Sequence, residues 1–200
     1  MPTAEILTAN VNDELELYEL APEDRGPPPD HIAEFVRGLA PCERALDLGC
    51  GDGRLTSELG CATVTGADVS AVALTRARRR LPEGRFVQVE LDSPLLFTDS
   101  EFDLVLCADT LEHVKDVQLF LSEARRVLEP GGRLAIATPA HSRFSGLDVI
   151  VRGFERRFDP FSPHIRFLTR RSLSRVLGEL GFEVERLRRV RGYLLALARR

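Results

Sequence analysis

The apolar positions of the chain follow two spacings that alternate along its length. Short and nearly continuous apolar runs predict five strands, over residues 45–48, 63–67, 85–91, 102–108 and 133–138. Between them, apolar residues at helical spacing predict helices over 32–39, 55–59, 71–81 and 117–128. This alternation is typical of a parallel sheet with helices on both faces.

The last part of the chain departs from this alternation of strands and helices. Thr169 precedes a helical pattern that Gly181 ends, and two further strands over 183–190 and 193–199 flank Arg191-Gly192. Such a pair predicts a hairpin at the edge of the sheet. The expected fold is therefore α/β, a Rossmann-like doubly wound sheet of seven strands, mostly parallel with an antiparallel last strand.

The chain is expected to form one domain, residues 1–200, with four parts. Residues 1–30 form an acidic leader that ends in Pro27-Pro28-Pro29, and 31–139 form a cofactor-binding core. Residues 140–168 interrupt the strand–helix rhythm as an insert, and 169–200 supply the last helix and the closing hairpin.

Composition narrows the class of protein. The net charge of −4 argues against general nucleic-acid binding, and no apolar run is long enough to span a bilayer. The acidic N-terminus does not resemble a signal peptide, so a cytoplasmic protein is expected. Four cysteines without metal or disulfide spacing predict reduced thiols. The oligomeric state is not predicted.

The most informative segment runs from Ala45 to Arg54. An apolar strand leads into Asp47 and then into the turn Gly49-Cys50-Gly51-Asp52-Gly53. Glycines permit positive φ and a close approach of ligand to backbone. Between the first strand and first helix of an α/β sheet, such a turn binds a nucleoside-bearing cofactor.

Two acids decide which cofactor is expected. A dinucleotide site has the spacing G-x-G-x-x-G, but here the third glycine comes early and position 54 is arginine. Asp47 suits a ligand with an ammonium group better than one with a pyrophosphate. Asp68 ends the second strand, where a carboxylate accepts hydrogen bonds from a free ribose. S-adenosyl-L-methionine meets this description.

Several segments together resemble the class I S-adenosylmethionine-dependent methyltransferases, in the small-molecule group that includes the quinone-biosynthesis enzymes (methyltransferase type 11). The similar segments are LDLGCGDGRL, GADVS, VELDSPLLF, FDLVLCADTLEHV and LEPGGRLAIATP. They cover roughly residues 42–139 in the family's order. The C-terminal segment FLTRRSLSRVLGELGFEVERLRRV is similar as well.

The resemblance implies a set of cofactor-binding residues. Asp47 and the backbone of Gly49, Cys50, Gly51 and Gly53 would hold the methionine end, and Asp68 the ribose. The adenine slot would comprise Val69, Leu91 and Asp92, although Asp92-Ser93-Pro94 also fits a plain turn. The floor below the sulfonium would comprise Ala108, Asp109, Thr110 and Leu111. Tyr18 could fold over the cofactor, as N-terminal tyrosines do in similar enzymes.

Few side chains are candidates for removing a proton from a methyl acceptor. His113 and Asp109 follow the fourth strand, His141 follows the fifth, and His164 lies at the end of the insert. His113 could equally orient its local helix. His31 is expected to be a solvated residue near a helix start. No metal site is expected, because Asp, Glu and His do not cluster in the sequence.

The insert is expected to be a substrate lid. Apolar residues within 147–158 share one helical face, with arginines elsewhere, which suits an aromatic or lipid-like acceptor with an anionic group. The same segment could instead contact a membrane surface or pack as an ordinary amphipathic helix.

The predicted function is methyl transfer from S-adenosylmethionine to an O, N or C centre of such a small molecule. One alternative is a non-catalytic cofactor-binding regulator or subunit of the same fold. An NAD-linked oxidoreductase or an aminopropyl transferase on a similar sheet is a further alternative. The spacing of the glycines disfavours NAD.

Overall fold

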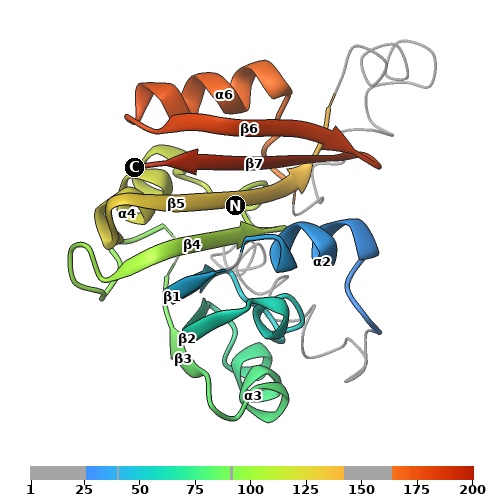
Figure 1. Ribbon diagram of the computed structural model, residues 1–200, viewed down its shortest axis with the longest axis vertical. Helices are drawn as coiled ribbons and strands as arrows, with labels where there is room; N and C mark the ends of the chain where they lie inside the picture. The colour runs from blue at the N-terminus through green and yellow to red at the C-terminus, as the bar shows by residue number, and fades with distance from the viewer. Residues whose placement is uncertain (1–25, 40, 91, 142–163) are drawn as a thin grey trace, which may run out of the picture.

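A computed structural model describes residues 26–39, 41–90, 92–141 and 164–200. Within these ranges seven strands form one sheet in the order β3-β2-β1-β4-β5-β7-β6 (Figure 1). All neighbouring pairs are parallel except those of β7, which runs antiparallel to both β5 and β6. The predicted fold class is confirmed. The strands are β1 (Cys42–Leu48), β2 (Cys61–Asp68), β3 (Arg85–Gln88), β4 (Phe102–Ala108), β5 (Leu128–Pro139), β6 (Glu183–Val190) and β7 (Tyr193–Arg199).

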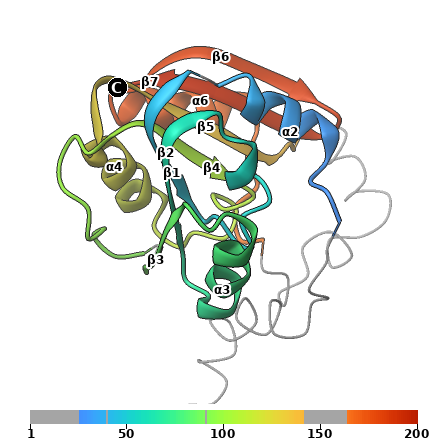
Figure 2. The ribbon, with the colours of Figure 1, turned by 60° about the horizontal axis from the view of Figure 1, so that its bottom comes forward.

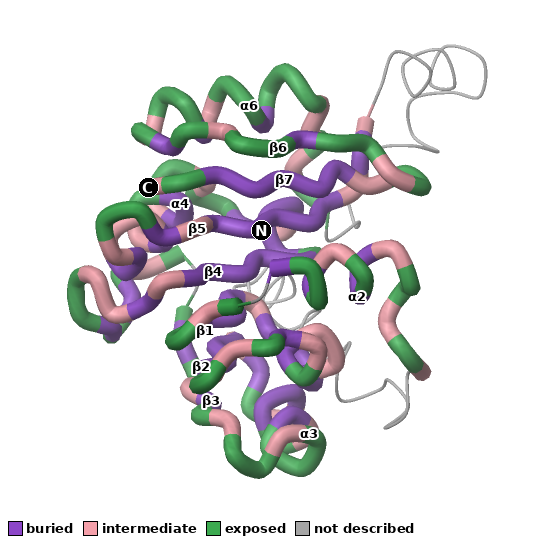
Figure 3. Tube along the Cα trace, viewed as in Figure 1, coloured by how far each residue is buried: buried purple, intermediate pink, exposed green. Residues whose placement is uncertain are grey.

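Helices cover both faces of the sheet. Apolar residues of α4 and α6 share one core cluster with β4, β5 and β7, whereas α2 packs on the opposite face of these strands. Helix α3 contacts β2 and β3, at the end of the sheet away from β6 (Figure 2). The central strands are buried and β6 is largely exposed (Figure 3). The helices are α2 (Asp30–Arg37), η1 (Thr56–Glu58), α3 (Ala71–Arg80), α4 (Val117–Val127) and α6 (Arg170–Glu179).

Side-chain caps fix where three helices begin. Ser70 accepts a hydrogen bond from the Ala73 amide at 3.2 Å, and Asp116 caps α4 in the same way. Thr169 and Ser172 form a reciprocal capping box at the start of α6. The helix start that the sequence predicts after Thr169 is confirmed.

The helix expected over 55–59 is the main error in the predicted elements. Only the three-residue 3₁₀ turn η1 forms there, because β2 already begins at Cys61 and leaves room for a single turn. The Thr56 hydroxyl in this turn donates a 2.6 Å hydrogen bond to the Asp47 carboxylate. The turn therefore supports the end of β1 rather than starting a longer helix.

The prediction of four reduced thiols is wrong for two of them. Cys42 and Cys61 form a disulfide between the amino ends of β1 and β2. The parallel register pairs these residues directly and brings their Cα atoms to 4.6 Å, a contact that their 19-residue separation did not reveal. Cys50 and Cys107 are free and buried.

Among the described helices, none is both long and apolar enough to cross a membrane.

Candidate active site

A cavity of about 400 Å³ opens at the carboxyl ends of the central strands. Strand order reverses between β1 and β4, which places the cavity at the topological switch point of the sheet. One wall consists of the glycine turn and the end of β2. The other consists of the turn after β4 with parts of four distant segments. The lining includes Pro28, Pro29, Asp47, Gly49, Cys50, Gly51, Asp52, Arg54, Leu55, Asp68, Val69, Ser70, Ala108, Asp109, Thr110, Glu112, His113, Pro139, His164 and Tyr193.

The glycine turn is held in shape by Asp68. One oxygen of this carboxylate accepts a 2.8 Å hydrogen bond from the Gly51 amide, and the other accepts one at 2.9 Å from Ser70. Gly49 has φ +85°, and a side chain there would overlap Thr110. Glycine is thus required for the turn to pass beside β4. Each Asp68 oxygen retains a lone pair that could accept a ribose hydroxyl.

Asp47 is a buried carboxylate at the end of β1, with 2% of its surface exposed. Burial raises its pKa to about 7, against the opposing effect of the hydrogen bond from Thr56, and the charge of Asp68 adds to the rise. Within the described residues, no basic group contributes to this pKa shift. A ligand ammonium group would supply a positive charge.

Arg54 ties the glycine turn to the segment before α2. Its Nε atom donates to an Asp52 oxygen at 3.1 Å, and its Nη1 atom donates to the Gly26 carbonyl at 3.1 Å. The other oxygen of Asp52 is buried and has no hydrogen-bond partner within the described residues. The hydrogen bond from Arg54 to Gly26 holds the start of this segment at the glycine turn, and Pro28 and Pro29, which follow Gly26 closely in the chain, line the cavity.

Asp109, the first residue after β4, lies on the opposite wall of the cavity. Its backbone is left-handed, with φ +52°, and its amide donates a 2.9 Å hydrogen bond to the Ala137 carbonyl. The residue is exposed and lines the cavity together with Tyr193. The surrounding walls reduce the hydration of Asp109, which raises its pKa above the usual range of an aspartate.

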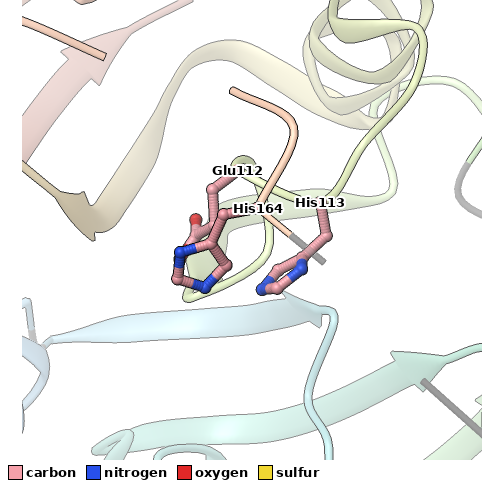
Figure 4. Close-up of side chains that lie close together, drawn as sticks. All are labelled: Glu112, His113 and His164. Atoms are coloured by element: carbon pink, nitrogen blue, oxygen red, sulfur yellow. The ribbon is translucent and has the colours of Figure 1, made fainter. Parts of the chain in front are cut away.

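Glu112, His113 and His164 also line the cavity, and their ligand atoms lie within 4.8 Å of one another (Figure 4). The two imidazole rings meet edge to face with centroids 4.8 Å apart. The buried Glu112 carboxylate accepts a 2.9 Å hydrogen bond from Thr138, and its backbone carbonyl accepts the Ile165 amide at 3.0 Å. The latter bond brings His164 to the cavity. The expected absence of a metal stays a prediction, since carboxylate and imidazole are also metal donors.

Most of the residues expected at the site line the cavity, and four of the described ones do not, Gly53 among them. Asp92 accepts hydrogen bonds from the Lys115 and Asp116 amides and does not line the cavity. Leu111 is fully buried in the apolar core. The ring of His141 packs against Phe167, with centroids 4.9 Å apart. Tyr18, Leu91, most of the insert and the 147–158 segment lie outside the described residues.

The structure adds residues that the sequence reasoning missed. Tyr193 and Glu112 line the cavity, and His31 lies behind Tyr193 rather than in solvent, with a ring-centroid distance of 5.3 Å. One sequence feature could have identified Tyr193 as a cavity residue: it is the first residue of the strand that was predicted to run antiparallel at the end of the chain. Because β7 pairs with β5 in reverse, its first residue lies opposite Pro139, at the carboxyl end of β5.

Comparison with known proteins agrees with this geometry. The methyltransferase domain family matches residues 46–136. A ubiquinone biosynthesis O-methyltransferase of Chelativorans sp. is 33% identical over 67% of this chain and 56% of its own. A demethylmenaquinone methyltransferase of Tropheryma whipplei is 38% identical over 53% of this chain and 46% of its own. The chain thus spans about half the length of these curated relatives.

A solved structure supports the fold independently. An S-adenosylmethionine-dependent methyltransferase from Mesorhizobium loti superposes with a TM-score of 0.66 at 22% identity, over 86% of this chain and 99% of that one. The fold, the switch-point cavity and the matched segments define a cofactor-binding α/β domain. This chain belongs to the class I S-adenosylmethionine-dependent methyltransferases, and its cofactor is S-adenosylmethionine.

Proposed function

We propose that this protein transfers the methyl group of S-adenosylmethionine to an O, N or C centre of a small aromatic acceptor related to quinone precursors. The observation that carries the proposal is the cavity with two chemically different walls. Asp68 and the glycine turn line one wall, and three proton-accepting side chains (Asp109, His113 and His164) line the other. The names of the two quinone-pathway relatives support the acceptor class.

The cofactor-binding wall supplies charge and backbone donors. In this proposal Asp47 faces the ammonium group of the cofactor, the turn from Gly49 to Gly53 surrounds the methionine end, and Asp68 holds the ribose hydroxyls. Val69 lies next to Asp68 and lines the cavity, which supports its place beside the adenine. When bound, the cofactor supplies an electrophilic methyl group on a sulfonium.

The protein then has to orient the acceptor and remove its proton. Asp109 is our first choice as the proton acceptor, because its carboxylate is open to the cavity and its raised pKa makes it a stronger base. The paired rings of His113 and His164 are the second choice. Ala108 and Thr110 flank Asp109 and would shape the floor on which the acceptor rests.

The test is methyl transfer from labelled S-adenosylmethionine to a panel of phenols of the quinone-precursor type, with amines and carbon acids in parallel. Mass spectrometry should find a methylated phenol, and Asp109→Asn should reduce its formation far more than it reduces cofactor binding. If the wild-type protein binds the cofactor but methylates no member of the panel, the acceptor class is wrong. If it does not bind the cofactor, the proposal fails as a whole.

A further inference from the structure

Charge is distributed unevenly along this chain. Residues 13–24, which we call the acidic segment, contain six acidic side chains and no basic one. Residues 166–200 contain ten arginines and only three glutamates. The net charge of −4 for the whole chain therefore conceals an acidic block near one end and a basic block at the other. Blocks of like charge are typical of segments that interact with a surface of opposite charge.

Two of these arginines lie on the face of the sheet that carries α2. In the register of β6 with β7, Arg186 is paired with Leu197 and Arg188 with Leu195. Side chains that are paired across two strands point to the same face of a sheet. Both leucines belong to the apolar cluster beneath α2. Arg186 and Arg188 therefore form a basic strip on this face, which we call the β6 arginine face.

The β6 arginine face is uncovered within the described part of the chain. Helix α6 packs on the other face of β6, where Leu187 shares a cluster with Leu173 and Leu177, and the apolar side of α2 packs on β4, β5 and β7. Arg186 and Arg188 are exposed, as is most of β6 (Figure 3). Neither guanidinium has a hydrogen bond or an ion pair with another described residue.

The glutamates of β6 do not neutralise this face. The Glu185 carboxylate forms an ion pair with Arg199 of β7. Glu183, the other acid of β6, is the first residue of the strand and is paired with the same Arg199. The arginines in the second half of β6 therefore keep an unbalanced positive charge, which attracts carboxylates from elsewhere.

The acidic segment enters the described structure close to this face. The ring of His31, in the first turn of α2, lies 5.3 Å from the ring of Tyr193, which begins β7 (Figure 1). Leu195, the partner of Arg188, is only about 7 Å further along β7. An extended chain spans about 3.3 Å per residue, so the acidic segment can reach about 40 Å from Gly26. The β6 arginine face is within that range.

We propose that the acidic segment docks on the β6 arginine face of its own chain and shields it from other polyanions. Charge complementarity and the continuity of the chain identify this occupant. A single exposed ion pair contributes little, but several carboxylates held near several guanidinium groups act together. The inference concerns a surface outside the cavity and does not depend on the methyl acceptor.

The rival explanation is protection of the sheet edge. β6 is the last strand of the sheet, and charged side chains on an edge strand discourage pairing with other chains. Arginines with that role would be solvated and would need no docked segment. The two explanations differ in where the acidic segment lies at low salt and in how strongly the protein binds a polyanion.

Two pairs of substitutions in the full chain separate the explanations. Arg186→Gln with Arg188→Gln neutralises the β6 arginine face. Arg170→Gln with Arg171→Gln is the matched control, because these exposed arginines begin α6 on the opposite face of the sheet. They too have no ion pair with another described residue. The pairs remove the same charge from surfaces that differ only in place.

A nitroxide label at Asn12→Cys reports the position of the acidic segment, because it broadens the NMR signals of nearby amides. The two free cysteines are buried and leave the new thiol as the reactive one. At about 0.05 M salt the amides of β6 should broaden in the wild type and in the α6 control. Salt of about 0.5 M should remove the effect, since it shortens the screening length several-fold.

The variant at the β6 arginine face decides the outcome. Arg186→Gln with Arg188→Gln should reduce the broadening at least about fivefold. Broadening centred on another element, or unchanged in this variant, would overturn the proposal. A nitroxide-bearing copy mixed with an isotope-labelled copy should give no broadening. A signal in that mixture would assign the segment to a second copy of the chain and would also overturn the proposal.

Heparin, used as a polyanion, tests the shielding. Glu14→Gln, Glu16→Gln and Glu19→Gln together weaken the acidic segment and should raise heparin affinity about tenfold at low salt. Adding Arg186→Gln and Arg188→Gln should remove that gain, and adding the α6 control pair should leave most of it. Equal heparin affinity of the wild type and the glutamine variant would overturn the proposal.

Discussion

The two walls of the cavity are built in different ways. The cofactor-binding wall of the proposal comes mainly from one stretch of sequence, between Asp47 and Ser70, and the hydrogen bonds of Asp68 stay within that stretch. The acceptor wall draws on segments around residues 28, 109, 139, 164 and 193, which only the finished sheet brings together. The comparison teaches that one wall is built by a single stretch of sequence, whereas the sheet topology builds the other, which we propose binds the acceptor.

The walls also differ in how water reaches their carboxylates. Asp47 and Asp68 have 2% and 7% of their surface exposed and are bound by neighbouring donors, whereas Asp109 is open to the cavity. Buried and pre-bonded groups suit binding, and an accessible carboxylate suits proton transfer. Substitutions on the two walls should therefore affect different measured quantities.

The largest expected effect belongs to Asp68→Ala. This change releases the Gly51 amide and would remove the ribose contacts that we propose for Asp68, so cofactor affinity should fall by about a hundred- to a thousandfold. Calorimetric titration measures it. Asp99→Ala is the matched control, since its carboxylate is exposed and pairs with Arg126 away from the cavity. Near-normal binding in Asp68→Ala would show that the walls are not divided as described.

On the acceptor wall, Asp109→Asn should show the opposite pattern. We expect kcat to fall about a hundredfold because a proton acceptor is lost, with cofactor affinity within about threefold of the wild type. Steady-state rates and calorimetry on the same preparation measure the two quantities. A variant that loses cofactor affinity and keeps kcat would reverse our assignment of the walls.

A smaller effect should appear in the pH dependence of cofactor binding. Asp47 has a pKa of about 7 in the free protein, and a bound ammonium group would favour its charged form. Affinity should therefore rise by up to about tenfold between pH 6 and pH 8, with proton release on binding at the lower pH. Calorimetry in buffers of different ionisation enthalpy detects this proton, and Asp47→Asn should abolish it.

The same pKa has a consequence for the stability of the cofactor-free protein. Because the folded-state pKa of Asp47 lies above its unfolded value of about 3.8, the folded protein binds more protons between these values. The Asp47 contribution to stability is complete below pH 4 and is lost as pH rises toward 7. Denaturant titrations at pH 5 and pH 8 should thus show a smaller difference in Asp47→Asn than in the wild type.

The smallest effect on the cavity is expected from removing the disulfide, which lies at the amino ends of β1 and β2, whereas the cavity lies at the carboxyl ends of the strands. Replacing Cys42 and Cys61 by serine opens a loop of 19 residues, which should cost about 3 kcal/mol of unfolding free energy. Cofactor affinity should remain within about twofold, since the bond lies at the amino ends of β1 and β2. A large loss of cofactor affinity at a temperature where the variant is folded would show that the disulfide at the amino ends of the strands is coupled to the cavity at their carboxyl ends.

Much of the fold was predictable from local patterns. The strands over 102–108, 183–190 and 193–199 agree residue for residue, because alternating or continuous apolar runs with clear turn signals define them. The caps at Ser70 and Thr169 depend only on neighbouring residues. The same locality explains why the glycine turn and Asp68 could be identified as one site.

The errors and omissions arise where distant segments meet. The disulfide depends on the register of β1 with β2, and the hydrogen bonds that Asp92 accepts come from the distant Lys115 and Asp116 amides. His31 was expected in solvent because nothing near it in sequence suggests a ring partner 5.3 Å away on β7. Such contacts become visible only once the strand order is known.

The most direct test of the account is a calorimetric titration of the purified protein with S-adenosylmethionine, S-adenosylhomocysteine and NAD, alongside Asp68→Ala and Asp109→Asn. We expect the first two ligands to bind the wild type and Asp109→Asn but not Asp68→Ala, and we expect no binding of NAD. Binding of NAD alone, or equal binding of the adenosyl ligands to Asp68→Ala, would contradict the assignment of the cofactor to the glycine-turn wall.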